Sequence, residues 1–150
     1  MTGQADIAAY DNEGKLALVV EVKNKVGTDS EWAARMRRNI LTHGLLPSVR
    51  FFLLALPDRF YLWKDKLLQH IEKPSYEINP APFLKSYLEK VSVNPENLSN
   101  EGFQLLIISW LKLLQTRELP ETLRQDSEWL VGSGLFDVIR NGRIISPAIL

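Results

Sequence analysis

The chain has 150 residues, of which 45% are hydrophobic and 24% charged, enough for one domain with its own core and far from a disordered composition. Eighteen acidic residues balance eighteen basic residues, which excludes an overall positive field and leaves nucleic-acid binding to a local patch. Because there is no cysteine, disulfides, thiolate nucleophiles and cysteine-bound zinc are excluded as well.

The sequence shows no targeting or membrane-spanning signal. No uninterrupted apolar run reaches the length of a membrane span, and the N-terminus lacks the basic-then-apolar pattern of a signal peptide. Together with the absence of cysteine, these patterns predict a soluble, cytoplasmic protein with no membrane partner.

Residues 6–23 are typical of a β-hairpin, because the turn formers Asp11 to Gly14 separate two apolar runs. A loop with an even number of residues places Asp6 opposite Val19 or Glu21, on their face of the hairpin. A three-residue loop with a bulged glycine would break that parity. The even loop also gathers the apolar residues on one face, namely Ile7, Ala9, Leu16, Leu18, Val20 and Val22. This pattern favours Asp6, Glu21 and Lys23 together on the other face.

The next elements complete a predicted sheet. Thr28 followed by Glu31 predicts a capping box and a helix from about residue 29 to 43 that ends at Gly44. The unbroken apolar run 51–56 is typical of a central, parallel strand buried on both faces, and 59–64 should be its antiparallel neighbour. We therefore expect an α/β fold with a mixed central sheet of about four strands and a crossover helix.

Three prolines in residues 74–82 predict an irregular linker between a sheet core at 1–73 and a helical extension at 82–150, within a single domain. Helices are expected over 82–91, from residues 94–99 to 117, and from 120 to 130. Residues 135–140 fit either a helix or the first strand of a hairpin, and their helical spacing favours the helix. Helix 103–114 is apolar nearly all round, so it is buried in this core, in a homodimer or against a partner subunit.

One group of residues offers a mechanism. Two carboxylates on adjacent strands, Asp6 and Glu21, can hold Mg²⁺ or Mn²⁺, while Lys23 assists an attacking water and stabilises developing charge. The alternative for these three residues is an ion network on a solvated strand face. The basic cluster Arg35, Arg37 and Arg38 is either a solvated helix face or, if it lies beside the hairpin, a phosphate-binding patch.

Aspartate, fourteen residues, glutamate, one apolar residue and lysine, on a hairpin followed by a helix, resembles the PD-(D/E)XK nuclease superfamily, the restriction-endonuclease-like fold. The resemblance covers Ala5 to Trp63. It implies that Asp6, Glu21 and the backbone carbonyl of Val22 ligate the metal and that Lys23 is the catalytic lysine. The helix around Arg35 to Arg38 would then flank the site.

The chain departs from the family's pattern in two ways. Ala5 stands where the family has a proline, and the five residues before Asp6 leave no room for the helix that normally opens the family's core. Three explanations are open for the missing helix. The sequence begins after that helix, or a later helix or a second subunit takes the place of the helix, or the fold no longer cleaves nucleic acid. The resemblance implies a magnesium-dependent DNA nuclease, with a non-catalytic interaction module or a subunit of a larger nuclease or defence complex as the alternative.

Overall fold

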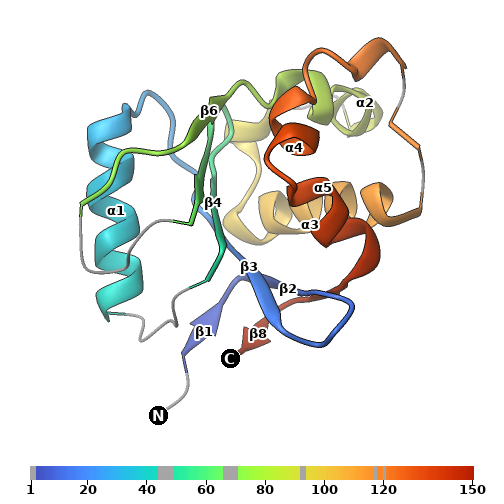
Figure 1. Ribbon diagram of the computed structural model, residues 1–150. Helices are drawn as coiled ribbons and strands as arrows, with labels where there is room; N and C mark the ends of the chain where they lie inside the picture. The colour runs from blue at the N-terminus through green and yellow to red at the C-terminus, as the bar shows by residue number, and fades with distance from the viewer. Residues whose placement is uncertain (1–2, 44–48, 66–70, 92–93, 117, 120) are drawn as a thin grey trace.

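The computed structural model describes residues 3–43, 49–65, 71–91, 94–116, 118–119 and 121–150 and has a β-sheet covered by helices on both faces (Figure 1). The strands of the main sheet, in their order across it, are β6 (Tyr76–Ile78), β5 (Phe60–Lys64), β4 (Phe51–Ala55), β3 (Leu16–Val22), β2 (Ile7–Tyr10) and β7 (Arg143–Ile145). A separate pair consists of β1 (Gln4–Ala5) and β8 (Ala148–Ile149). The helices are α1 (Ser30–His43), α2 (Ala81–Val91), α3 (Asn100–Thr116), α4 (Glu128–Gly132) and α5 (Leu135–Asn141), with short 3₁₀ turns η1 (Pro95–Asn97) and η2 (Glu121–Leu123).

The sheet is mixed, as the sequence predicts. Strands β3 and β4 are parallel, joined by the crossover helix α1, and each other neighbouring pair is antiparallel. All five residues of β4 are buried, which confirms its predicted central position. The prediction of about four strands is wrong, because β6 forms inside the expected linker and β7 forms near the C-terminus. Each has only three residues, too few for a recognisable alternation of apolar and polar side chains.

The register of β2 and β3 agrees with the prediction, although the turn that joins them differs from it. Residues 11–15 form an odd-numbered turn, in which the Asp11 carboxylate accepts hydrogen bonds from the amides of Glu13 and Lys15, both at 2.9 Å. A bulge then restores the parity, because Tyr10 pairs with Leu16 whereas Ala9 pairs with Leu18. Leu16 is therefore displaced to the opposite face, which corrects one member of the predicted apolar set.

Helix α1 begins with a cap that differs from the prediction. The carboxylate of Asp29 accepts the amide hydrogen bond of Trp32 at 2.8 Å, as an N-cap residue does. The hydroxyl of Thr28, which was the expected cap, instead lies 2.9 Å from the Tyr61 hydroxyl. The predicted helix end at Gly44 lies outside the described residues.

Both faces of the sheet are buried, against different partners. Apolar side chains of one face, such as Leu53 and Leu62, pack against α2 to α5. Those of the other face, such as Phe52 and Trp63, pack against α1. The C-terminal half is therefore not an extension: it covers one face and adds β7 beside β2 and β8 beside β1 (Figure 1).

The helical predictions for this half are largely confirmed. Helices α2, α3 and α5 occupy the expected stretches, and residues 135–140 are helical rather than extended. The helix expected from 120 to 130 is replaced by η2 and the short α4, although Pro120 itself lies outside the described residues. The apolar helix α3 is buried in this chain's own core through five side chains, namely Phe103, Ile107, Trp110, Leu111 and Leu114.

The orientation of α3 gives a stability prediction. Ile107→Ala should lower the free energy of unfolding by about 2–5 kcal/mol, because Ile107 is fully buried against the sheet. Leu105→Ala on the same helix should change it by no more than about 0.5 kcal/mol, since Leu105 is 64% exposed. Urea unfolding measures both values. Equal losses, or a midpoint that rises with protein concentration, would place the Leu105 face in a subunit interface instead.

Candidate active site

The structure brings Asp6 and Glu21 together at one end of the hairpin. Asp6 lies at the bend between β1 and β2, and the register of Ile7 with Val20 continues to Asp6 opposite Glu21. The amide of Val22 donates a hydrogen bond of 2.8 Å to Oδ2 of Asp6. The charge of Asp6 and hydrogen bonding to it influence the pKa of the Glu21 carboxyl. The two acids therefore interact as a pair.

Burial changes the chemistry of this pair. Glu21 is 9% exposed and lies beside Leu54 of β4, whose side chain packs on the α1 side of the sheet. Desolvation, followed by the charge of Asp6 and a hydrogen bond from its carboxyl, raises the pKa of Glu21 to about 8. At neutral pH the pair therefore retains a proton unless a cation takes the place of that proton.

Lys23 completes the predicted group. Its main-chain amide donates a hydrogen bond of 3.1 Å to the carbonyl of Ala55, which keeps the backbone beyond β3 attached to β4. Its side chain is exposed, and the positive charge partly offsets the rise in the pKa of Glu21. A buried carboxyl, a half-buried carboxyl and an accessible ammonium group thus share one location.

The C-terminal half supports Asp6 through contacts that sequence reasoning missed. The Asp6 carbonyl accepts hydrogen bonds from Oγ of Ser146 at 2.7 Å and from Nε2 of Gln104 at 3.3 Å. Ser146 precedes β8, and Gln104 belongs to α3. Because these residues lie 140 and 98 positions away from Asp6, no local sequence signal connects them with the hairpin.

The three arginines of α1 are not equivalent. Arg35 and Arg38 are exposed, whereas Arg37 is 3% exposed and its guanidinium lies 5.6 Å from the centroid of the Trp63 ring. Arg37 therefore belongs to the layer between α1 and the sheet, and its side chain is shielded from a phosphate backbone. A further cation, Lys25, lies 5.0 Å from the Trp32 ring at the start of α1.

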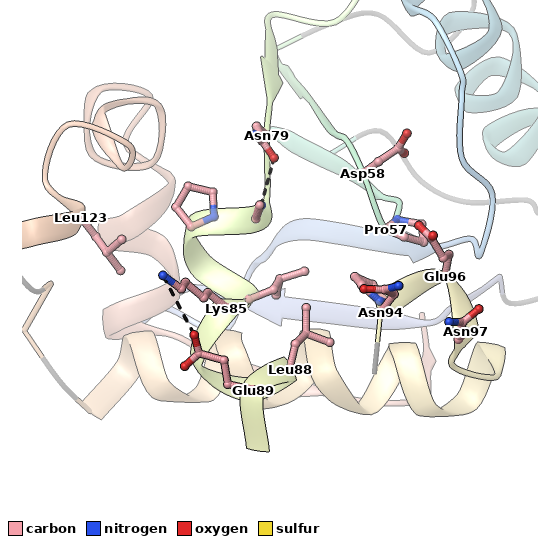
Figure 2. A pocket seen from close by; sticks show the side chains of 14 residues that line it. Pro57, Asp58, Asn79, Lys85, Leu88, Glu89, Asn94, Glu96, Asn97 and Leu123 are labelled. Atoms are coloured by element: carbon pink, nitrogen blue, oxygen red, sulfur yellow. Dashed lines mark hydrogen bonds and ion pairs between the residues drawn. The ribbon is translucent and has the colours of Figure 1, made fainter. Parts of the chain in front are cut away.

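A groove of about 990 Å³ lies beside α2, between the β4–β5 turn and η1 (Figure 2). Its charged side chains are Asp58, Lys85, Glu89 and Glu96, and the lysine and Glu89 form an ion pair at 4.0 Å. The remaining acids give the groove a negative balance. It is therefore poorly suited to bind a polyanion.

No protein-family model, curated protein or solved structure matches the chain. Over the described part of the chain, no group of three or more histidine, aspartate or glutamate side chains is placed to hold a metal ion. The acidic ligands that this site offers are accordingly Asp6 and Glu21. None of the described helices is long and apolar enough to cross a membrane.

The raised pKa of Glu21 predicts a particular pH dependence of stability. A carboxyl whose pKa is raised by folding contributes stability that is complete below pH 4.5 and is lost as the pH rises through about 8. The free energy of unfolding should thus fall between these values, with a contribution of up to about 1.4 kcal/mol per pH unit from this group.

The matched measurement is urea unfolding of the wild type and Glu21→Gln from pH 4.5 to 8.5 in the presence of a chelator. The amide cannot ionise, so the difference between the two proteins isolates the contribution of Glu21. Parallel stability curves would show that the Glu21 carboxyl titrates normally.

Proposed function

We propose that the chain is a metal-dependent nuclease that hydrolyses phosphodiester bonds in DNA, with Asp6, Glu21 and Lys23 as its catalytic residues. The observation that supports this proposal best is that the Asp6 and Glu21 carboxyls interact at one strand end beside an accessible lysine. A hairpin face that served only solubility would have no reason to bury a carboxyl against another carboxyl, because the arrangement disfavours both charges.

The donor set fits a divalent cation. Two carboxylates in contact need a positive partner, and Mg²⁺ commonly uses one or two carboxylates while keeping several of its waters. Asp6 and Glu21 would hold it, together with the main-chain carbonyl of Val22 at the same strand end. When bound, Mg²⁺ or Mn²⁺ supplies charge neutralisation for a phosphate and acidifies a water molecule.

The other roles in the reaction would fall to side chains of the protein itself. The network around Asp6 holds its carboxylate, and burial keeps the Glu21 carboxyl away from bulk water, which strengthens its electrostatic interactions. The Lys23 ammonium, exposed beside the pair, would orient the scissile phosphate and stabilise the negative charge that develops on it. These roles define an acid pair for ligation and a lysine for transition-state stabilisation.

Cleavage assays with near-isosteric variants test this function. Asp6→Asn, Glu21→Gln and Lys23→Met should each reduce Mg²⁺- or Mn²⁺-dependent cleavage of DNA by at least about 100-fold, because each removes a charge from the site. Glu13→Gln and Lys15→Met in the exposed turn of the same hairpin are matched controls and should retain activity. Full activity in all three site variants would refute the assignment.

The exposed basic residues of α1 make the proposed DNA contact. Replacing Arg35 and Arg38 together by alanine should weaken DNA binding without loss of stability. The slope of log K against log salt concentration should decrease by about 2, because two phosphate contacts are lost. Arg37→Met should instead lower the free energy of unfolding, since its side chain is buried over Trp63. Titrations at several salt concentrations, with urea unfolding, separate these effects.

The second candidate is a non-catalytic interaction module, such as a subunit of a larger nuclease or defence complex. Two observations favour this candidate. Among the described residues the site offers two acidic ligands, with no third one placed beside them. The pair can also share a proton without a metal. A wild-type protein that binds no Mn²⁺ and cuts neither single- nor double-stranded DNA or RNA would select this candidate. Its partner, or a second copy, would then appear in sizing experiments.

A further inference from the structure

Asp6 occupies an interruption in a two-stranded ribbon. Strand β1 pairs with β8 and β2 pairs with β7 in one continuous register, from Gln4 with Ile149 to Ala8 with Ile145. Figure 1 shows the β1–β8 end of this ribbon near the two chain ends. Asp6 falls between β1 and β2, and Ser146 falls between β7 and β8. At this point, side chains rather than the strand ladder bind the Asp6 carbonyl.

Three hydrogen bonds close a small network at this interruption. Oγ of Ser146 donates to the Asp6 carbonyl at 2.7 Å, and Nε2 of Gln104 donates to the same carbonyl at 3.3 Å. Nε2 of Gln104 also donates to Oγ of Ser146 at 3.1 Å. All three groups are partly buried, so the loss of one donor would not be fully compensated by water.

The network fixes the remaining free group of Asp6. Its carboxylate accepts the hydrogen bond of the Val22 amide at 2.8 Å. Its carbonyl is bound by Ser146 and Gln104. With the side chain and the carbonyl both engaged, rotation of the peptide plane that follows Asp6 would break at least one of these hydrogen bonds.

We propose that Ser146 and Gln104 are positioning residues that hold Asp6 in the orientation at which its carboxylate meets Glu21 and the Val22 amide. A role of these two residues in metal ligation rests on the proposed function, because hydrogen bonds to ligating groups orient those groups toward the metal. It also explains how the helical half takes part in the site: α3 and the β7–β8 connection each contribute one donor.

The amide of Val22 reports the position of Asp6 directly. In Ser146→Ala and Gln104→Ala, hydrogen exchange of this amide should accelerate by about fivefold or more, because its acceptor is no longer held in place. The amide of Val20, in the paired part of the same strand, should keep its wild-type rate. Ser146→Thr retains the hydroxyl and should restore protection of Val22.

Two residues of α3 are matched controls. Gln115 also bridges two carbonyls, those of Ile139 at 3.0 Å and Gly142 at 2.8 Å, and Ser109 donates to the carbonyl of Leu105 at 2.8 Å. Gln115→Ala and Ser109→Ala should leave Val22 exchange unchanged. Unchanged Val22 exchange in both Ser146→Ala and Gln104→Ala would overturn the proposal. Equal acceleration of Val20 and Val22 would also overturn it, because it indicates a general loss of stability.

Calorimetric titration with Mn²⁺ separates this inference from the proposed function. Ser146→Ala should weaken Mn²⁺ binding by about tenfold or more, with recovery in Ser146→Thr. Wild-type affinity in Ser146→Ala, despite faster Val22 exchange, would contradict a role in ligation. If the wild type itself binds no Mn²⁺, the nuclease proposal fails, while Val22 exchange still decides whether Ser146 and Gln104 hold Asp6.

Discussion

Strand β3 is buried on both faces and carries a carboxylic acid one residue before its end, and the surrounding structure has to accommodate that group. Val20 faces the C-terminal helices and Val19 faces α1, so neither side of the strand reaches water. A side chain at the end of such a strand emerges into a low-dielectric environment. Glu21 therefore needs a partner that supplies a proton or a positive charge, and Asp6 with Lys23 stands at that position.

The burial of β3 on both faces also requires a layer of helices on each side of the sheet. A parallel pair such as β3 and β4 requires a crossover, and α1 supplies it while covering one face. The other face would remain exposed without α2 to α5, whose aromatic residues Phe83, Trp110 and Trp129 pack over the sheet. The helical half thus covers the face opposite the one that carries Glu21, and through Ser146 and Gln104 it also contacts Asp6.

Strands from near the C-terminus lie beside the strands that flank Asp6. The edge of the main sheet beside β2 is occupied by β7, which follows α5 near the C-terminus. The connection from β7 to β8 brings Ser146 within 2.7 Å of the Asp6 carbonyl. Elements far apart in the sequence therefore complete the surroundings of the hairpin.

The sequence by itself determined the local elements and the candidate residues. Alternating apolar residues and a turn define the β2–β3 hairpin, an unbroken apolar run defines β4, and helical spacing defines α1, α3 and α5, because each pattern spans enough residues to establish a period. The spacing of Asp6, Glu21 and Lys23 likewise suffices to nominate them. Short strands, the bulge at the turn and the Asp29 cap were missed, since their signals are too brief or compete with equally good alternatives. Only the tertiary structure decided which arginine is buried, how far Glu21 is desolvated and which distant side chains hold Asp6, because these properties depend on the packing of segments that are not neighbours in the sequence.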